Sequence, residues 1–358
     1  MSGKSKKLLV VGGGRSIHTY NFINLVGDYF SDIMLLTDYE DKNHSNIKKC
    51  VVDFSFHNPI KILHSYISIR RLLKDYKPDF IACYQVDTAA FLTLLSNKKH
   101  IPTLVTAMGS DILLNQHKGF FHKFLIKYVL NKAKYHNTGA LHVAQQMQQL
   151  ANKPLEVVVA NLGFDNDIAP QEKQNIVYSN RLHKPLYQIP HIIRAFAKFY
   201  KYHSDWRLVV AASGDEETLA VLADELGIKS AVSFVGWLDR QANNHFYEIS
   251  RLWVSIPQSD CTPISLMEAM AAGCIPIVSN LPTMRQWIED GKTGIIVEDL
   301  DSNFMERALQ LDYTQLLTAN NNLMIEQGSK EANRKKFYGI FNKEFGSATN
   351  SQIAKTKP

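Results

Sequence analysis

The stretch WVSIPQSDCTPISLMEAMAAGCIPIVS, at residues 253–279, decides the fold. It opens with an apolar run, passes through a polar turn, continues as an alanine-rich helical segment and stops at Gly273 before a second apolar run. Glycine is favoured at a helix stop because it adopts left-handed backbone angles without strain. Short apolar runs on either side of a helix predict a strand–helix–strand connection within a parallel sheet.

The same alternation extends in both directions along the chain. Other short apolar runs are LLVV (8–11), IMLL (33–36), FIAC (80–83), TLVTA (103–107), VVVA (157–160), LVVAA (208–212) and GIIV (294–297). Amphipathic helical stretches lie between them. We therefore predict an α/β fold of two Rossmann-like, doubly wound domains that face a cleft.

A polar, turn-rich segment, NLGFDNDIAPQEKQ at 161–174, separates the two halves. Each half has the usual size of a domain. We place a first domain at 1–168, a second at 169–328, a helix at 329–346 and a disordered tail at 347–358.

Composition excludes several classes of protein. The 358 residues are 45% hydrophobic and 21% charged, as in a globular protein, and no apolar run is long enough to span a membrane. The four cysteines lack CxxC spacing, which argues against a disulfide framework or zinc site and favours the reducing cytoplasm. A net charge of +6 without an aromatic-basic pattern gives no reason to expect a nucleic-acid partner.

One local segment is strongly basic. Residues 117–136, HKGFFHKFLIKYVLNKAKYH, interleave lysines with apolar side chains as an amphipathic helix would. Such a helix can lie on an anionic membrane, here the inner face of the cytoplasmic membrane. Alternatively, its apolar face packs in the domain core and its lysines face water.

The turn before the helical segment has the features of an anion site. Thr262 is suited to cap the helix and Pro263 to be its first residue, which leaves the amides of Ile264 and Ser265 available to phosphate. The helix dipole would stabilise a diphosphate there. Glu268, one to two turns further on, can accept both hydroxyls of a ribose. The alternative is an ordinary helix with a solvated glutamate.

An acidic residue, seven intervening residues, a glutamate, an alanine-rich helix and a glycine together resemble the family 4 glycosyltransferases of the GT-B fold. Asp260 stands where that family more often has glutamate, and it would meet hydroxyls of the donor sugar. The resemblance implies a retaining, nucleotide-sugar-dependent transferase that needs no metal ion or other cofactor. It also implies that the 329–346 helix crosses back to the first domain, although that helix could equally cap the second.

A second matching segment is SNRLHKPLYQIPHIIRAF, at 179–196. The family places an arginine here, which matches Arg181, and a lysine about five residues later, both on the donor diphosphate. Leu186 and Tyr187 occupy the expected position of the lysine, so Lys184 is the nearest candidate.

The first strand is followed by Gly12, Gly13 and Gly14 and then by a helix, which predicts an anion-binding loop. This pattern resembles the fingerprint of a nicotinamide-dependent dehydrogenase, with Asp38 as the acid for the ribose. The third glycine of that fingerprint would fall on Ile17, whose side chain should obstruct close packing of helix and strand.

Weaker matches add further candidates near the transferred sugar and the base. His18 lies in a segment that resembles the opening of many family members, and Asp111 belongs to a turn similar to the family's GSD turn. Asp111 either orients the acceptor or caps the next helix. Gly236 and Trp237 match a turn that lies near the nucleotide base in relatives.

These features predict transfer of a hexose or N-acetylhexosamine from a nucleotide-sugar, by frequency among relatives a UDP-sugar, to a glycan or lipid-linked glycan. Three alternatives remain: a GT-B sugar-nucleotide epimerase, an NAD-dependent dehydrogenase, and a silent subunit that binds sugar nucleotides.

Overall fold

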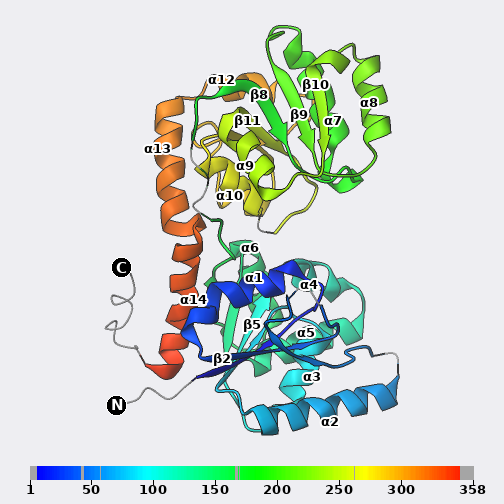
Figure 1. Cartoon of the computed structure of the whole chain (residues 1–358), viewed down its shortest axis with the longest axis vertical. Coiled ribbons are helices and arrows are strands. Elements are labelled where there is room, and N and C mark those ends of the chain that lie inside the picture. The colour runs from blue at the N-terminus through cyan, green and yellow to red at the C-terminus, as the bar shows by residue number, and fades with distance from the viewer. Residues whose placement is uncertain are drawn as a thin grey trace. The chain divides into compact units, whose positions relative to one another are not determined.

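A computed structural model of the chain describes residues 6–41, 44–56, 58–165, 168, 170–261 and 263–346. The chain divides into two compact units (Figure 1). Unit 1 comprises residues 1–162 and 333–358, and unit 2 comprises residues 163–332. The division thus falls between Leu162 and Gly163, before the position that we predicted from the polar segment at 161–174. The tail at 347–358 lies outside the described residues.

Unit 1 contains a parallel sheet of seven strands in the order β3-β2-β1-β4-β5-β6-β7. The strands are β1 (Lys7–Val11), β2 (Asp32–Thr37), β3 (Lys48–Val51), β4 (Phe80–Cys83), β5 (Thr103–Ala107), β6 (Tyr135–Thr138) and β7 (Val157–Val159). The order reverses between β1 and β4. In open α/β sheets, ligands bind at the carboxyl edge where the loops after two such strands diverge.

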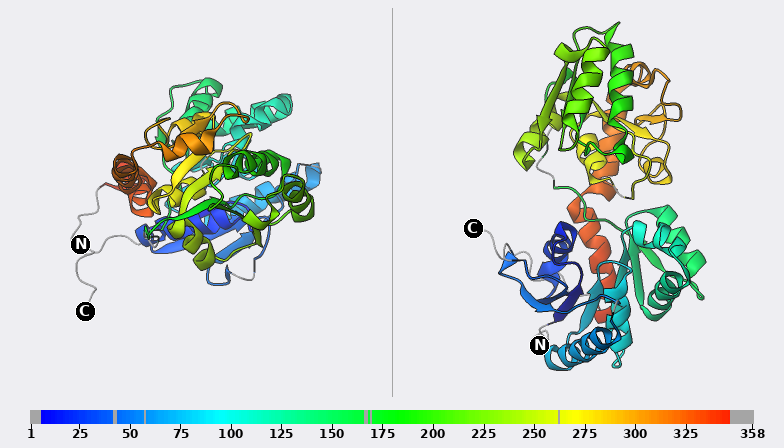
Figure 2. Two further views of the ribbon diagram at one scale, coloured as in Figure 1. Left: turned by 90° about the horizontal axis from the view of Figure 1, so that it is seen from above. Right: turned by 90° about the vertical axis from the view of Figure 1, so that its right-hand side faces the viewer.

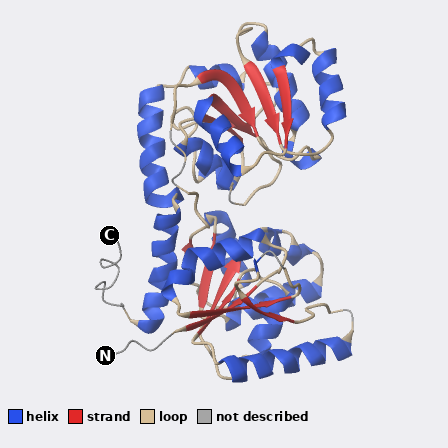
Figure 3. Cartoon of the chain, in the orientation of Figure 1, coloured by secondary structure: helices blue, strands red, loops and turns tan. Residues whose placement is uncertain are grey.

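Helices cover both faces of this sheet (Figure 3). They are α1 (Ile17–Val26), α2 (Pro59–Tyr76), α3 (Thr88–Ser96), α4 (Ser110–Leu113), α5 (Phe120–Lys132), α6 (Leu141–Leu150) and α14 (Lys330–Phe345). The helix predicted at 117–136 is therefore shorter, because Tyr135 and His136 belong to β6.

The C-terminal helix α14 belongs to unit 1 from Asn333 onward. Figure 2 shows α14 beside the sheet of unit 1. Its aromatic and aliphatic side chains Phe337, Ile340 and Phe341 are buried with Leu8 and Val10 of β1. Burial of large apolar side chains stabilises such an arrangement by about 1.5–3 kcal/mol for each side chain. The last helix of the chain thus completes the core of the first unit.

Unit 2 contains a parallel sheet of six strands in the order β10-β9-β8-β11-β12-β13. The strands are β8 (Gln174–Ser179), β9 (Arg207–Ala211), β10 (Val232–Gly236), β11 (Ser250–Ser255), β12 (Ile275–Ser279) and β13 (Ile295–Val297). The order reverses between β8 and β11.

Successive strand residues of unit 2 point into two separate apolar cores. Leu252 and Val254 of β11 pack in one core, whereas Trp253 packs in the other. The first core is closed by α7 (Ile189–Tyr200), α8 (Glu216–Glu225), α12 (Phe304–Leu309) and α13 (Tyr313–Leu323). The second is closed by α9 (Arg240–Ile249), α10 (Ile264–Ala271) and α11 (Pro282–Arg285). Because both faces are covered, the central residues of β8, β9, β11 and β12 are apolar on both sides of the sheet.

Among the described residues, no helix combines the length and the apolar character that crossing a bilayer would require.

Candidate functional site

The strongest candidate site in unit 2 lies at the reversal of strand order. Arg181 follows β8, and Asp260 lies on the loop between β11 and α10. Ligands of open α/β sheets bind where the loops of two such strands diverge. The two segments that the sequence singled out, 179–196 and 257–273, therefore meet at the edge of the sheet that suits a ligand.

Arg181 is held by three neighbours. Its Nε donates to Oγ of the buried Ser255 at 2.8 Å, and its guanidinium lies over the ring of Tyr187, with 5.2 Å between Cζ and the ring centroid. Its Nη2 forms an ion pair with the carboxylate of Asp260. Because the two side chains are only 15% and 18% exposed, this pair is screened less than a surface pair. The arginine is fixed in place and already engages an anion.

The loop after Arg181 is tied to the loop after β11. Gln188 Nε2 donates to the carbonyl of Ile256 at 2.7 Å, and the amide of Gln258 donates to the carbonyl of Leu186 at 2.9 Å. Lys184 lies just before these two hydrogen bonds and precedes a single 3₁₀ turn, Pro185–Tyr187. Its side chain is exposed. Its ammonium has no acceptor within the described residues, so it is available to a ligand.

The helix after Asp260 begins one residue later than we predicted. Pro263 is the N-cap of α10 and Ile264 is its first residue, while Thr262 lies outside the described residues. The amides of Leu266 and Met267 donate back to the carbonyl of Pro263. Within the described chain, the amides of Ile264 and Ser265 have no acceptor, and the buried Oγ of Ser265 has no hydrogen-bond partner. These three groups fit a phosphate oxygen.

Glu268, further along α10, is oriented by a tyrosine from the neighbouring helix. The hydroxyl of Tyr247 donates to Oε2 of Glu268 at 3.1 Å and accepts from Nδ2 of Asn180 at 2.7 Å. Burial raises the pKa of Tyr247 well above its ordinary value, and the charge of Glu268 raises it further. The phenol is therefore a stable donor at neutral pH.

This hydrogen-bonded chain continues into the core, and we did not predict it from the sequence. The indole of the buried Trp253 donates to Oδ1 of Asn180 at 3.0 Å. Asn180 and Tyr178 both donate to Oδ1 of Asn243, at 3.0 and 2.7 Å. Asn180 directly precedes Arg181, so one network positions the backbone of the arginine and the carboxylate of Glu268. A polar residue at the end of an apolar strand was the only available signal.

The turn after β10 exposes an aromatic ring. Gly236 has a φ of 65°, a left-handed value that suits glycine, and its carbonyl accepts from the amide of Ala212 at 2.7 Å. The next residue, Trp237, is 74% exposed. An exposed indole offers a face on which a planar base can stack.

In unit 1, packing accounts for two of the three glycines after β1. A Cβ on Gly12 would lie 2.8 Å from Oγ1 of Thr19, and one on Gly14 would lie 2.1 Å from the carbonyl oxygen of Tyr39. The amide of Gly14 donates to Oδ1 of Asp38 at 3.1 Å. We expected this loop to present its amides to an anion; instead, the Gly14 amide is already bound to a carboxylate. Gly13 is the exposed member of the three.

Our steric argument about Ile17 was wrong, because its side chain is exposed and Thr19 is the residue that packs on Gly12. A second observation still argues against the dehydrogenase alternative. The carboxylate of Asp38 accepts a hydrogen bond from the Gly14 amide, so this oxygen is already engaged and is not open to a ribose. His18 is exposed on the first turn of α1.

Asp111 holds a turn together from inside unit 1. Its buried carboxylate accepts hydrogen bonds from the amides of Val86, Met108, Gly109 and Ile112, at 2.8–3.1 Å. Burial raises its pKa, and these amides oppose that effect. We predicted that Asp111 either orients the acceptor or caps the next helix. In this structure its carboxylate joins the loops after β4 and β5, and a contact with an acceptor stays a prediction.

Asp87, which we did not predict, lies beside the reversal of strand order in unit 1. It follows β4 and caps α3, with Oδ1 accepting from the amide of Ala90 at 3.0 Å. Burial raises its pKa to about 6; the amide hydrogen bond opposes this, and the negative charge of Asp111 adds to it.

Comparison with protein families covers most of both units. Residues 164–313 match the family described as glycosyl transferases group 1, and residues 7–136 match the family described as glycosyl transferase 4-like. The chain belongs to the GT4-like glycosyltransferases. Both matches include the sheet edges described above.

Two curated relatives of this glycosyltransferase match over part of their length. The alpha-monoglucosyldiacylglycerol synthase of Acholeplasma laidlawii is 25% identical over 105 residues, which are 29% of this chain and 26% of the relative. An uncharacterized glycosyltransferase of Methanocaldococcus jannaschii is 30% identical over 140 residues, 38% of this chain and 35% of the relative. The match thus spans about a quarter to a third of each curated relative.

Solved structures match this glycosyltransferase over nearly its full length. The lipopolysaccharide outer core galactosyltransferase WaaB has a TM-score of 0.74 at 15% identity, covering 94% of this chain and 99% of that one. Anabaena HepE in complex with UDP has a TM-score of 0.78 at 12% identity, covering 94% and 100%. These likenesses support the GT-B fold with two Rossmann-like domains, as the sequence predicted.

One acid of each Asp-x-Asp sequence forms an ion pair. Two Asp-x-Asp sequences occur, at 165–167 and 299–301. Asp165 pairs with Arg240 and Lys330, each at 2.5 Å, and Asp301 pairs with Lys198 at 3.1 Å. Within the described residues, no group of three or more histidines, cysteines or acids is arranged to hold a metal ion.

Proposed function

We propose that this protein transfers a hexose or N-acetylhexosamine from a UDP-sugar to a glycan or lipid-linked glycan, with retention of configuration and without a metal ion. The observation that carries the proposal is in unit 2. At the point where the strand order reverses, three groups come together. They are the guanidinium of Arg181, the start of α10 and the carboxylate of Glu268.

The diphosphate of the donor would bind between Arg181 and the start of α10. Arg181 pairs with Asp260 in the unliganded chain. A bound phosphate would accept hydrogen bonds from the guanidinium in place of Asp260, whose carboxylate could then accept a hydroxyl of the sugar. The amides of Ile264 and Ser265 and the hydroxyl of Ser265 supply the neutral donors. Lys184 supplies a second cation from the exposed loop.

The nucleoside would lie next to the diphosphate. Glu268 accepts the two ribose hydroxyls, with its carboxylate held by Tyr247. Trp237, exposed after Gly236, offers a stacking face for the base. The complexes of Anabaena HepE with UDP and with UDP-glucose concern that protein, and they support uridine as the base here.

In the reaction, negative charge builds on the departing diphosphate while positive charge builds on the sugar ring. Fixed cations and amides that face this charge lower the barrier, the task that a divalent ion performs in metal-dependent transferases. The acceptor hydroxyl attacks from the face that the phosphate leaves, and a phosphate oxygen takes its proton, so configuration is retained. His18 and Gly13, both exposed on unit 1, are candidates for contact with the transferred sugar.

The acceptor is proposed on weaker grounds. The Acholeplasma relative is named for a glucosylated diacylglycerol, which supports a lipid-linked acceptor. We also propose peripheral contact with the anionic inner face of the cytoplasmic membrane through residues 117–136. The exposed side chains of Phe120, Phe121 and Phe124 on α5 support this contact, because the buried face of that helix consists of other residues.

Isothermal titration calorimetry with UDP, UDP-sugars and NADH tests the donor assignment. We expect UDP and one UDP-sugar to bind and NADH not to bind. Arg181→Ala should weaken UDP binding by about tenfold to a hundredfold, as loss of a charge-assisted contact implies. The matched control is Arg207→Ala. Arg207 is the first residue of β9, and its guanidinium donates to the carbonyl of Ser230, outside the proposed donor site.

Three results would contradict the proposal: binding of NADH in place of UDP, equal UDP affinity in both variants, or a new sugar nucleotide formed without any acceptor. The last result would identify an epimerase. Once an acceptor is found, NMR of the product reports whether the anomeric configuration is retained.

A further inference from the structure

Helix α2 of unit 1 has apolar residues on both of its faces. Its buried side consists of Ser65, Ile69, Leu73 and Tyr76. On the opposite side, Ile60, Leu63 and Ile67 are 77%, 59% and 56% exposed. An ordinary surface helix presents polar residues on its outward face. In the part of unit 1 that the structure describes, these three side chains are therefore left mostly to solvent.

The same outward face becomes strongly basic toward the end of the helix. At 100° per residue, the exposed apolar residues and Arg70, Arg71 and Lys74 fall within an arc of about 100°. All three cations are exposed. Arg71 lies 3.6 Å from the carboxylate of Asp75. The first three turns of this face are thus apolar and its last two are cationic.

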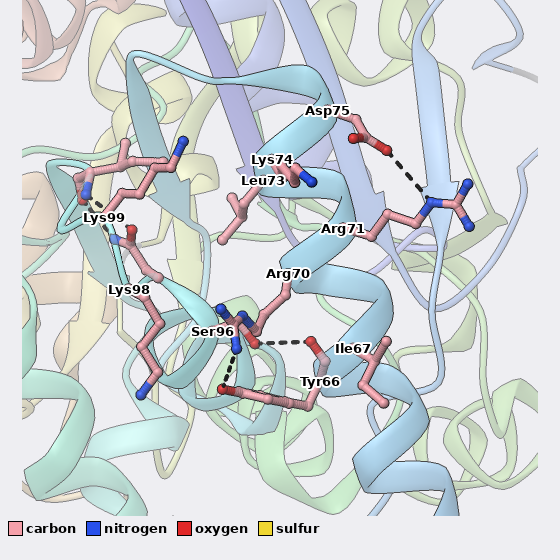
Figure 4. Close-up of a pocket in the computed structure, with 12 residues that line it drawn as sticks. Tyr66, Ile67, Arg70, Arg71, Leu73, Lys74, Asp75, Ser96, Lys98 and Lys99 are labelled. Atoms are coloured by element: carbon pink, nitrogen blue, oxygen red, sulfur yellow. Dashed lines mark hydrogen bonds and ion pairs between the residues drawn. The ribbon is translucent and has the colours of Figure 1, made fainter.

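A pocket of about 670 Å³ opens beside the cationic part (Figure 4). Its walls are α2 and the segment 96–101 after α3. Arg70 extends from α2 toward Ser96, and Lys98 and Lys99 lie on the opposite wall. The segment is braced by Asn97, whose side chain exchanges hydrogen bonds with the carbonyl and amide of Ile101 at 2.8 and 2.9 Å.

The pocket has an excess of unneutralised positive charge. Five of its lining residues are cationic, Asp75 is its one acid, and Arg71 is already paired with that acid. Lys74, Lys98 and Lys99 have no carboxylate within ion-pair distance among the described residues. Cations gathered around a hollow attract a ligand that carries several negative oxygens, such as a phosphate ester.

The apolar part of α2 continues onto α5 through aromatic contacts. Phe56, just before α2, lies 5.4 Å from the ring of Phe121 and 5.9 Å from that of Phe91 of α3. Phe91 in turn lies 6.3 Å from Phe124. On the same helix end, Phe120 is 88% exposed. Exposed apolar residues on α2 and α5 therefore belong to one layer of three helices.

We propose that the α2 pocket binds the phosphate of an anionic lipid headgroup while the exposed apolar residues of α2 enter the membrane interface. Apolar side chains beside a cluster of cations are complementary to a surface whose phosphates lie above its acyl chains. A soluble phosphate ester would match the pocket but would leave Ile60, Leu63 and Ile67 in water. The site is built from residues of unit 1 alone and shares none with the proposed donor site of unit 2.

Co-sedimentation of the full chain with vesicles tests the proposal. The probes are vesicles of phosphatidylcholine alone and of phosphatidylcholine with phosphatidylglycerol, over a series of salt concentrations. We expect binding to the anionic vesicles only. Each cation near such a surface contributes about a fivefold gain in partitioning, so neutralising Arg70, Lys74 and Lys98 with glutamine should weaken binding by about 100-fold and flatten the salt dependence.

The matched control neutralises three exposed lysines of unit 2, Lys201, Lys229 and Lys292, which removes the same charge. It should change partitioning by about twofold at most. Ile60→Ser with Ile67→Ser should weaken binding and keep the salt dependence, because it removes only apolar contact.

Equal binding to both kinds of vesicle, or equal loss in the two charge variants, would overturn the proposal. So would calorimetric binding of glycerol phosphate to the pocket without any binding to anionic vesicles, which would identify a soluble ligand. Thermal melting of the full chain serves as the folding check for each variant. UDP affinity, which reports on unit 2, separates failure of this proposal from failure of the proposed function.

Discussion

Replacing Tyr247 by Phe removes the one hydroxyl that joins Asn180 to Glu268. In the structure this hydroxyl accepts at 2.7 Å and donates at 3.1 Å. The substitution keeps the ring, which is fully buried among the residues around α9 and α10. Tyr247 therefore acts through Glu268 as a positioning residue, and the change should affect the donor site without altering the packing.

The expected cost in stability is modest. Asn180 keeps Oδ1 of Asn243 as a partner at 3.0 Å, and the half-buried carboxylate of Glu268 can turn toward water. Loss of such a hydrogen bond costs about 1–2 kcal/mol. In a unit of this size, each kcal/mol lowers the melting temperature by about 2–4 °C, so we expect a decrease of about 2–8 °C.

The effect on the donor KM should be larger than the effect on kcat. Without the Tyr247 hydroxyl, the carboxylate of Glu268 loses one of its hydrogen bonds and is held less firmly. Orienting it for the ribose then costs about 1–1.4 kcal/mol, a rise in the donor KM of about five- to tenfold. The kcat should fall by less than about threefold, because the ribose contact is the same in the ground state and the transition state.

Tyr313→Phe is the matched control. Its hydroxyl donates to the carbonyl of Gly273 at 2.9 Å, at the far end of α10, so it has a comparable bond in the same unit. Calorimetry and steady-state kinetics should show a similar loss of stability for both variants and a change in donor KM for Tyr247→Phe alone. Equal donor KM values in the two variants, at equal loss of stability, would refute the positioning role.

Other predictions concern charge. Arg181→Ala should lower kcat by about a hundredfold to a thousandfold and Arg181→Lys by less, since lysine keeps the charge but loses the fork; near-normal rates with alanine would remove Arg181 from the site. Excess EDTA should leave the transfer rate unchanged, and a loss that manganese restores would show that a metal takes part. Asp87→Asn should stabilise unit 1 at pH 7.5 by up to about 3 kcal/mol and have little effect at pH 4. The pKa of Asp87 is raised to about 6 in the folded unit. The ionised carboxylate therefore lowers the free energy of unfolding above that pH, and this loss disappears as pH falls toward the pKa of aspartate in the unfolded chain. Thermal melts of both proteins from pH 4 to 8 should therefore diverge, and parallel melting curves would contradict the buried charge.

Local sequence was enough to predict the parallel sheets and the residues at their carboxyl edges. Arg181, Asp260 and Glu268 were found from spacing and resemblance, because a strand–loop–helix unit places its loop at that edge whatever surrounds it. The predicted start of α10 was one residue too early, and the helix predicted at 117–136 was too long. The ends of helices depend on neighbouring residues in the fold, which the local sequence pattern does not contain.

The network around Tyr247 could not be predicted in the same way. Asn180, Asn243 and Trp253 come from three different elements, and nothing in their spacing shows that their polar atoms meet. Asp111 and Gly14 show the reverse case. Both have the residue types of a ligand site, but backbone amides and a neighbouring carboxylate already satisfy them.

The sequence by itself determined the alternation of strands and helices, the domain type and the chemistry available at the sheet edge of unit 2. These follow from the period of apolar residues and from the donors and acceptors that each side chain carries. Only the tertiary structure decided which polar groups remain open to a ligand, and which face of α2 stays uncovered. Hydrogen bonds and burial are made between segments far apart in the chain, so whether a group is satisfied is a property of the folded unit.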